Sequence, residues 1–297
     1  MRRIRGRMTS RPDIVPVILV GGRDARLWPL TNSKRPKEFL SLGTGLSFFQ
    51  RTALRGRAFS QPIIVCHQRY EDTVYRQMAQ IKMEPRTVLL EPDHRGTAAA
   101  IGVAAHLLKG IGALMLVQPG DQSLKNVRAF EKGVIESIAY TIENMVLFGV
   151  KPMSPESDYG YIVMAEGDRA CRPVRRFIEK PDVRGAKELI ARGDCLWNTG
   201  MFLTRPSVFL QLLERSAPKI YGGAQKALAV GTHENVSIQL NKKIFSEFES
   251  VSVDIVLLKR ISSAFVRDLD VEWSDIGSWW RLFRWRREER AVSRYSA

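Results

Sequence analysis

Short apolar runs alternate with stretches of helical periodicity through the first half of the chain. The pattern predicts strands at residues 14–20, 62–66, 87–91 and 113–119, separated by helices near 46–57, 70–81, 96–108 and 127–141. Strands that are separated by single helices form βαβ units, whose strands lie parallel in one sheet. The pattern therefore predicts an α/β fold, a Rossmann-like mixed, mainly parallel sheet that is flanked by helices.

From about residue 145 the apolar runs become shorter and turns separate them. The pattern predicts short strands and turns in 154–164, 171–182, 195–204, 251–259 and 265–280 and helices near 184–192 and 206–215, while the residues 216–250 are polar and weakly patterned. No internal repeat and no linker rich in Pro, Gly or Ser divides the chain. We therefore expect one domain over 13–297, with a nucleotide half at about 13–144 and a second-substrate half at about 145–280.

Polar corners follow three of the predicted strands, at residues 21–26 (GGRDAR), 91–97 (EPDHRGT) and 118–122 (QPGDQ). Ligands of parallel sheets bind beyond the carboxyl ends of the strands, so these corners predict one site at one edge of the sheet. The first corner contains a glycine turn and Arg26, and Lys37 follows further along the chain. This combination of a glycine turn and basic side chains suits phosphate. Asp24 lies in the same loop and would repel phosphate, so the loop alone leaves open whether this phosphate site works.

The net charge of +15 is concentrated at the ends of the chain. Residues 1–11 hold five arginines and no acidic residue, and residues 281–294 hold six arginines and two glutamates, so the body is only mildly basic. Basic ends attract nucleic acid or anionic surfaces, but short charged ends are more often solvated or frayed. We therefore expect a basic N-terminal tail at 1–12, a basic C-terminal tail at 281–297, and no nucleic-acid partner. The apolar runs are too short for a membrane span.

The three cysteines form no close pair, and neither they nor the four histidines show the spacing of a zinc site. Free cysteines are typical of proteins in a reducing compartment. We therefore expect a cytoplasmic protein with no disulfide and no transition metal. The opening "MRRIRGRMTS" is similar to the start of a signal peptide but lacks the apolar core and cleavage site that follow one, and Met8 is a second candidate start.

The polar corners belong to longer motifs. "GGRDARLWPLTNSKRPKEFL" resembles the signature loop of the nucleotide-sugar pyrophosphorylases, a nucleotidyltransferase family, and its "LWPL" is similar to the mannose-1-phosphate guanylyltransferase branch. Five further motifs follow in the order of that family: "LEPDHRGTAAAI", "QPGDQ", "GVKPMSPESDYGYI" with "FIEKPD", "LWNTGMFL", and "SVDIV" with "WSDIGSWW". The resemblance covers residues 14–280 and implies the nucleotide-diphospho-sugar transferase fold. From this sequence we expect no isomerase domain of the kind that some family members carry.

The resemblance implies a nucleotidyl transfer between GTP and mannose 1-phosphate, which yields GDP-mannose and pyrophosphate for polysaccharide or glycoconjugate synthesis. Such a step needs two anions held in line and their charge neutralised, rather than a covalent nucleophile. By resemblance the catalytic residues are Arg26, Lys37 and Asp121, and Asp121 and Asp275 hold Mg²⁺. Carboxylate and phosphate oxygens are ligands that Mg²⁺ prefers. Without the other motifs, the two basic residues would be interpreted as solvated loop cations.

The resemblance also places residues around the two substrates. Around the nucleotide it places Gly21, Gly22, Arg95, Thr97 and Ala98. Around the sugar phosphate it places Gly160, Glu179, Lys180, Asn198 and Thr199. Each motif taken alone has a plainer interpretation, namely a helix cap, a charged strand end before a turn, or a turn residue.

The chain departs from the family pattern in the glycine loop, where positions 23–25 are Arg, Asp and Ala instead of Ser, Gly and Thr. Gln122 stands where the family usually has His, Lys259 stands where it usually has Glu, and the segment 216–250 is short. Two interpretations fit, an active enzyme that tolerates the altered loop, or a catalytically impaired or regulatory paralogue that binds nucleotide or nucleotide sugar. A nucleic-acid-binding protein that uses its arginine-rich ends is a more distant alternative. The oligomeric state stays open, a homodimer included.

Overall fold

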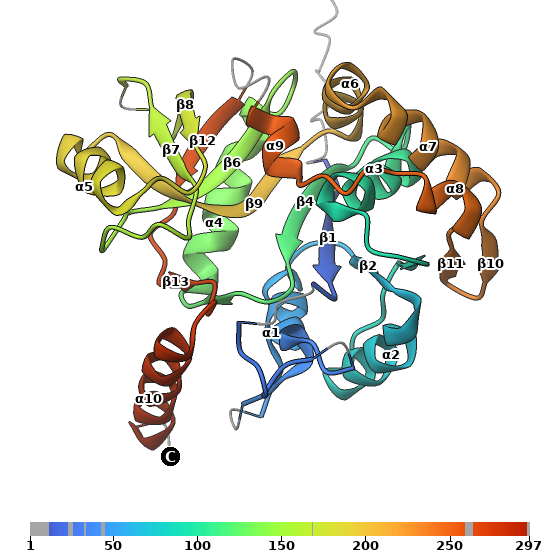
Figure 1. Ribbon diagram of the computed structural model, residues 1–297, viewed down its shortest axis with the longest axis horizontal. Helices are drawn as coiled ribbons and strands as arrows, with labels where there is room; N and C mark the ends of the chain where they lie inside the picture. The colour runs from blue at the N-terminus through green and yellow to red at the C-terminus, as the bar shows by residue number, and fades with distance from the viewer. Residues whose placement is uncertain are drawn as a thin grey trace, which may run out of the picture.

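The computed structural model describes residues 12–22, 26–32, 34–42, 45–167, 169–258 and 264–295, and Figure 1 shows its elements. The strands are β1 (Ile14–Val20), β2 (Ile63–His67), β3 (Thr87–Glu91), β4 (Leu114–Pro119), β5 (Ser123–Leu124), β6 (Met145–Val150), β7 (Tyr161–Met164), β8 (Cys171–Ile178), β9 (Cys195–Thr204), β10 (Thr232–Glu234), β11 (Ser237–Gln239), β12 (Ala264–Asp268) and β13 (Trp273–Ser274). The helices are α1 (Phe48–Arg55), α2 (Glu71–Gln80), α3 (Gly96–Leu108), α4 (Val127–Ser137), α5 (Val183–Arg192), α6 (Pro206–Ser216), α7 (Pro218–Ala229), α8 (Lys242–Ser246), α9 (Val253–Leu258) and α10 (Trp279–Tyr295). Short 3₁₀ helices occupy Lys37–Phe39, Gln68–Tyr70 and Ile138–Tyr140.

One sheet of eleven strands runs through both halves in the order β10-β11-β3-β2-β1-β4-β9-β6-β12-β8-β7. In the nucleotide half the strands are parallel, and β1 lies between β2 and β4, with Val17 paired to both Ile63 and Val117. Alternate side chains of β1 face opposite ways, so Val17 packs against α3 and Ile18 packs against α1 and α2. The predicted α/β fold with helices on both faces is confirmed.

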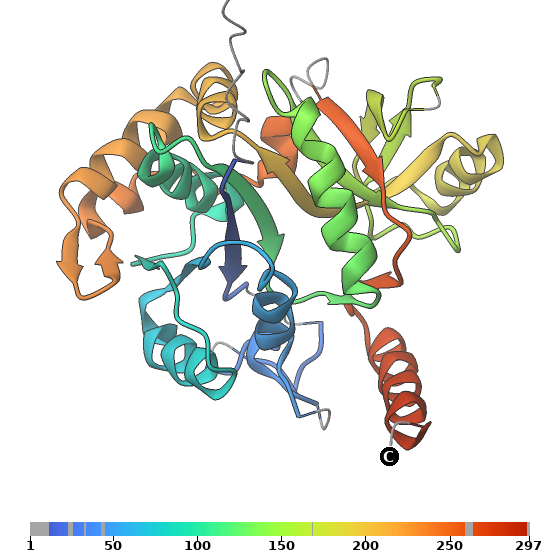
Figure 2. The same cartoon turned by 180° about the vertical axis from the view of Figure 1, so that it is seen from behind.

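The second half of the sheet is mostly antiparallel, and a short connection joins the antiparallel neighbours β7 and β8. The ten-residue strand β9 pairs antiparallel with β4, β6 and β7, and thereby joins the two halves of the sheet. Figure 2 shows α4 lying across this part of the sheet, where Phe130 of α4 meets the ring of Phe148 at 6.0 Å between centroids.

The segment 216–250 contains more order than its weak pattern predicts. It forms α7, the hairpin of β10 and β11, and α8, and β11 adds a parallel strand beside β3. The buried residues of α7 are Ile220, Ala224 and Ala227, whose spacing at three and four residues gives one narrow apolar face toward α3. Small residues on that face lower its apparent hydrophobicity, which is why the sequence pattern is weak.

Two further segments differ from their predicted structure. Residues 253–258 form the helix α9, and not a strand, because Val253 and Val256 lie three residues apart on a buried face. The expected C-terminal tail is instead α10 up to Tyr295, since Leu282 and Trp285 are buried against Leu27 and Phe48. Figure 1 shows α10 projecting from the body next to β13. The expected N-terminal tail lies outside the described residues.

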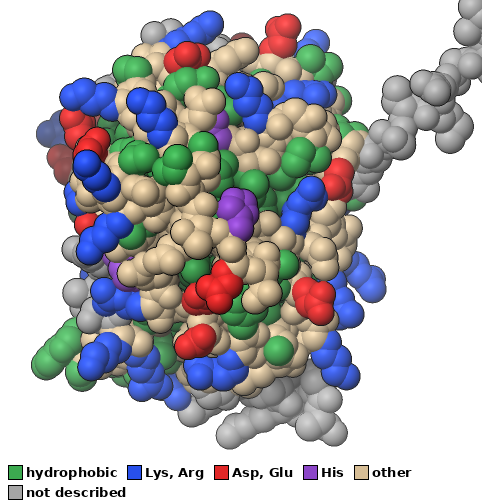
Figure 3. Space-filling view, turned by 90° about the vertical axis from the view of Figure 1, so that its right-hand side faces the viewer, with side chains coloured by type: hydrophobic (Ala, Val, Ile, Leu, Met, Phe, Trp, Pro, Cys, Tyr) green, Lys and Arg blue, Asp and Glu red, His purple; other side chains and the backbone are tan. Residues whose placement is uncertain are grey.

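The surface around α7, α8 and the β10–β11 hairpin faces the viewer in Figure 3. There, the described lysine and arginine side chains are separated from one another by acidic, apolar and uncharged groups. This part of the surface therefore does not have the continuous basic face that is typical of nucleic-acid binding. Within the described chain, no helix combines the length and the apolar character that crossing a bilayer requires.

Candidate active site

The predicted polar corners do meet at one edge of the sheet. Because β1, β3 and β4 are parallel, the glycine turn, the corner after Glu91 and the corner before Asp121 all follow carboxyl ends of strands. Leu19 is paired with Pro119, and Gly120 donates from its backbone N to the carbonyl oxygen of Leu19 over 2.8 Å. The start of the glycine turn and the corner that contains Asp121 are thus direct neighbours.

Lys37 lies at the centre of this edge. Its side chain is fully buried, and its Nζ lies 2.8 Å from Asp121 Oδ2 and 2.6 Å from the backbone oxygen of Asp275. A buried ammonium is stable only when charged or polar partners surround it. The structure therefore brings together three of the predicted site residues, two of them more than two hundred positions apart in the chain.

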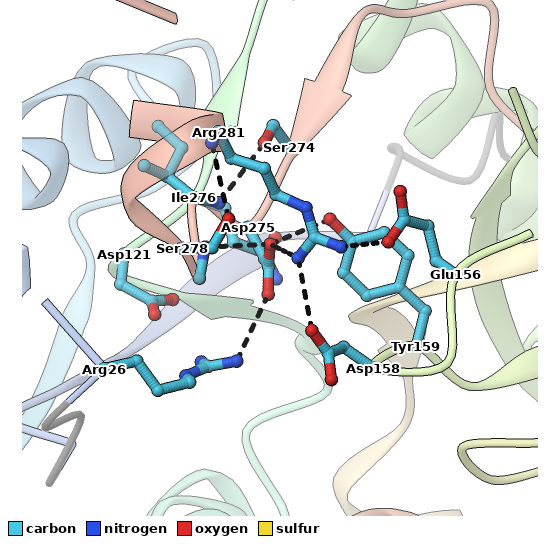
Figure 4. A network of polar contacts seen from close by, with 12 residues as sticks. Arg26, Asp121, Glu156, Asp158, Tyr159, Ser274, Asp275, Ile276, Ser278 and Arg281 are labelled. Atoms are coloured by element: carbon cyan, nitrogen blue, oxygen red, sulfur yellow. Dashed lines mark hydrogen bonds and ion pairs between the residues drawn. The ribbon is translucent and has the colours of Figure 1, made fainter. Parts of the chain in front are cut away.

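Asp275 is the hub of a second set of contacts (Figure 4). Its Oδ1 accepts hydrogen bonds from the Tyr159 hydroxyl at 2.8 Å, the Gly277 backbone N at 3.1 Å and Arg281 Nη1 at 3.2 Å. Its Oδ2 lies 4.0 Å from Nη1 of Arg26, whose side chain is half exposed. Arg26 thus reaches the site from the glycine loop, with its guanidinium beside Asp275.

Arg281 is a site residue that the sequence interpretation missed, because it was assigned to a solvated tail. Its guanidinium stacks over the ring of Tyr159, with Cζ 4.5 Å from the ring centroid. The same guanidinium binds Glu156 through Nη2 and lies 3.8 Å from Asp158 Oδ2 through Nη1. The helical spacing of Leu282 and Trp285 is the signal that could have placed Arg281 against the body.

The glycine turn has an unexpected internal partner. Gly21 has φ +100°, and a Cβ there would lie 2.8 Å from Cε2 of Tyr70, so the position requires glycine. The backbone N–H groups of Gly21 and Gly22 both donate to Oε1 of Glu38, at 2.8 and 2.7 Å. Burial, together with the charge of Asp121, raises the pKa of Glu38 to about 7. The altered loop positions 23–25, by contrast, lie outside the described residues.

The residues predicted near the sugar gather around the start of β7. A Cβ at Gly160 would lie 2.9 Å from Oε2 of Glu179, and the backbone N of Asn198 donates to the Gly160 carbonyl at 2.8 Å. Lys180 is exposed and its Nζ lies 3.2 Å from Glu179 Oε1. Asn198 also donates from Nδ2 to Asp254 Oδ1 at 3.0 Å, so α9 contributes an acidic residue that the sequence interpretation missed.

Thr199 points away from this group. Its hydroxyl donates to the Phe148 carbonyl at 2.7 Å inside the sheet, and the residue is buried. Its backbone oxygen accepts a hydrogen bond of 2.7 Å from Gln122 Nε2, while Gln122 Oε1 accepts one of 2.9 Å from Trp273 Nε1. Gln122 therefore ties the corner of β4 to β9 and β13.

The polar groups of the corner after Glu91 are used within the chain. Thr97 Oγ1 accepts from the Val253 backbone N at 2.8 Å, and the Ala98 backbone N donates to the Val251 carbonyl at 3.1 Å. Arg95 Nη2 lies 2.9 Å from Asp93 Oδ2. The corner is thus fastened to the segment that precedes α9, and nucleotide contacts by these residues stay a prediction.

The two aspartates fit a hard divalent cation in their chemistry. Within the described chain, no cluster of three or more His, Cys, Asp or Glu side chains could hold a metal by itself. Magnesium is commonly bound by one or two carboxylates together with water and substrate phosphates. Asp121 contacts Lys37 through its carboxylate and Asp275 through its backbone oxygen, and these two residues are the ones that would hold the metal.

The sequence model of the nucleotidyl transferase family matches residues 15–291, almost the whole chain. The chain belongs to the nucleotidyl transferase family. Enzymes of this family generally use divalent metal ions. The predicted resemblance and the predicted nucleotide-diphospho-sugar transferase fold are therefore confirmed.

This chain spans about three fifths of the length of the curated relatives that it matches. The xanthan biosynthesis protein XanB of Xanthomonas campestris pv. campestris is 38% identical over 272 residues, which are 90% of this chain and 58% of XanB. Mannose-1-phosphate guanylyltransferase of Escherichia coli is 34% identical over 282 residues, 91% of this chain and 61% of that protein. The crystal structure of mannose-1-phosphate geranyltransferase from Thermus thermophilus superposes with a TM-score of 0.79 at 25% identity, over 90% of this chain and 77% of that chain.

Proposed function

We propose that this chain transfers a guanylyl group from GTP to mannose 1-phosphate and forms GDP-mannose and pyrophosphate. In this reaction a phosphate oxygen of mannose 1-phosphate forms a bond to the α-phosphorus of GTP. The bond from that phosphorus to the bridging oxygen of the β-phosphate breaks, and pyrophosphate leaves with the electron pair. The observation that carries the proposal is the meeting of Arg26, Lys37, Asp121 and Asp275 at one edge of the sheet.

Electrostatic positioning is the chemistry that this site can supply. Lys37 is fixed before substrate binds, so its charge can act on a phosphoryl group without reorganisation. Arg26 offers a planar guanidinium that can bind two phosphate oxygens at once. Mg²⁺ held by Asp121 and Asp275 would neutralise further phosphate charge when bound. We infer that these charges, rather than a covalent nucleophile, lower the barrier.

The group around Gly160 is the proposed sugar-phosphate site. Glu179 and Asn198 supply acceptors and donors for hexose hydroxyls, and the missing side chain at Gly160 lets Oε2 of Glu179 lie close to its backbone. Lys180 would meet the sugar phosphate as a point charge. The hydroxyl of Thr199 is engaged inside the sheet, so we assign a sugar contact to its backbone only.

The name of one relative supports these substrates, since the E. coli relative is called mannose-1-phosphate guanylyltransferase. None of the relatives named above is called a regulatory protein. We also propose a cytoplasmic location, because all three cysteines are free and buried.

The test is pyrophosphate release by the purified protein with Mg²⁺, with GTP beside ATP, UTP and dTTP, and with mannose 1-phosphate beside glucose 1-phosphate. We expect release with the pair of GTP and mannose 1-phosphate, and loss of release when EDTA removes the metal. No release from folded protein with any pair would overturn the proposal and favour the non-catalytic paralogue. Release with another pair alone would correct the substrates.

Two variants connect the activity to the site. Asp121→Asn keeps the shape of the side chain but removes the charge that faces Lys37, so we expect a loss of pyrophosphate release of about a hundredfold or more with the fold intact. Lys132→Met changes an exposed lysine on α4 and is the matched control for a change of charge. A fully active Asp121→Asn variant would refute the role of Asp121.

A further inference from the structure

Glu38 is a buried carboxylate in the candidate site to which the proposed reaction gives no role. It follows Lys37 in the first 3₁₀ helix and is 5% exposed. A carboxylate is expensive to bury unless donors satisfy it. The backbone N–H groups of Gly21 and Gly22 are those donors, and both point at the same oxygen, Glu38 Oε1.

The turn is held from two sides. On one side the ring of Tyr70 lies against Gly21, whose positive φ and missing Cβ allow that approach. On the other side Glu38 Oε1 lies 3.5 Å from the place that a Cβ of Gly22 would take. Glu38 therefore holds the backbone of Gly21 and Gly22 where the chain leaves β1.

This arrangement also changes which groups can bind phosphate. Two successive backbone N–H groups that converge on one point form the kind of concave site that binds an anionic oxygen. Here a side-chain carboxylate already occupies that point. The residue before it, Lys37, points at Asp121 and Asp275 instead.

We propose that Glu38 is a positioning residue of the nucleotide site, which holds the Gly21–Gly22 turn from inside while the half-exposed side chain of Arg26 receives the triphosphate and the buried charge of Lys37 stabilises it. This inference rests on the proposed function and deepens it, because it assigns the phosphates to side-chain cations rather than to these two backbone N–H groups.

The test compares Glu38→Ala with Glu38→Gln in steady-state kinetics. Glu38→Ala removes the acceptor of both N–H groups, so we expect the KM for GTP to rise about tenfold or more, with a smaller change in the KM for mannose 1-phosphate. Glu38→Gln keeps a carbonyl oxygen at the same reach, so it should restore the KM for GTP to within about threefold of the wild type. If Glu38 had a merely structural role, Glu38→Ala would lower the melting temperature and would not raise the KM for GTP more than the KM for mannose 1-phosphate.

A model in which the triphosphate binds the N–H groups of Gly21 and Gly22 predicts a change of the opposite sign in the KM for GTP. If the triphosphate displaces Glu38 and binds the two N–H groups, Glu38→Ala removes a competitor, and the KM for GTP falls below that of the wild type. A fall, or no change, in the KM for GTP overturns the proposal. If Glu38→Ala does not fold, Glu38→Asp, which is shorter by one methylene, takes its place with the same expected rise.

Failure of the proposed function is visible separately, as wild-type protein that releases no pyrophosphate with any substrate pair. In that case the same variants are compared by calorimetric binding of GTP. Weaker binding by Glu38→Ala than by Glu38→Gln supports the positioning role, and equal or tighter binding overturns it.

Discussion

Tyr159 donates a hydrogen bond of 2.8 Å to Asp275 Oδ1, so a tyrosine just before β7 holds a carboxylate that follows β13. Burial, and then the charge of Asp275, raises the pKa of Tyr159 far above its usual value. Tyr159 therefore stays a donor throughout the physiological pH range. The contact connects the proposed sugar side of the site to the carboxylate that faces Arg26.

Tyr159→Phe should impair the reaction more than the fold. The ring would keep its edge contacts with Trp197 and Trp273, whose centroids lie 5.0 and 5.1 Å away. Loss of one hydrogen bond to a charged group costs about 1.5–3 kcal/mol, so we expect kcat/KM to fall about tenfold or more and the protein to remain folded. Tyr140→Phe, at the end of the 3₁₀ helix after α4, is the control. Kinetics equal to those of the control would show that the orientation of Asp275 does not depend on Tyr159.

Trp285→Ala should release α10 from the body. Trp285 is buried beside Phe48, with ring centroids 5.0 Å apart, and its Nε1 donates to Ser123 Oγ at 2.9 Å. Truncation of a buried tryptophan costs about 3–5 kcal/mol, which urea denaturation would measure. Activity should fall with stability, because Arg281 lies on the same helix. Trp280→Ala, which removes a mostly exposed ring from this helix, should leave both quantities close to wild type.

Glu91 should make stability depend on pH. Burial, and then the charge of Asp93, raises its pKa from 4.5 to about 8. Between these values the folded protein binds more protons than the unfolded chain, so the contribution of Glu91 to the free energy of unfolding is full below about pH 4.5 and is lost as pH rises to about 8.

Glu91→Gln removes this titration. The amide stays neutral, so the variant should gain stability relative to the wild type as pH rises from 6 to 8.5, by about 1–3 kcal/mol. Denaturation curves at both pH values measure the difference. Parallel pH profiles of the two proteins would contradict the raised pKa.

Gly96→Ala, which adds only a Cβ, should destabilise the folded protein strongly. Gly96 has φ +77°, and a Cβ there would lie 2.7 Å from the backbone N of Val251. Strain and collision together should cost about 3 kcal/mol or more. Gly110→Ala is the matched control, since φ is +84° and the space around it is open, so only the backbone cost of about 1 kcal/mol applies. Equal losses of stability in the two variants would show that the backbone of Val251 moves away from the added Cβ at little cost.

The elements that the sequence predicted well are those whose burial follows a simple period. Strand 87–91 and helix 96–108 have the predicted bounds, because each combines a continuous apolar run with a polar corner. The meeting of Asp121 with the glycine turn also followed from a topological rule about strand ends.

The features that sequence reasoning missed depend on contacts between distant segments. The arginines of α10 concealed the spacing of Leu282 and Trp285, so Arg281 was assigned to solvent. Glu38 is satisfied by N–H groups sixteen and seventeen positions away, and no periodicity reveals such a pair. Thr97 carries a hydroxyl that suits a ligand, yet it caps a neighbouring backbone instead.

The two halves of the chain are interleaved in space, which has a consequence for dividing the protein. Residues 206–239 follow β9 in the sequence, yet α6, α7 and β11 return to pack on α3 and β3 of the first half. A fragment that ended near residue 144 would leave one edge of β4 without β9 and expose the alanine-rich face of α3. The two halves therefore cannot be exchanged as separate units between relatives. Complementation of the first half by a second fragment would succeed only if that fragment supplied β9, α6, α7 and β11 together.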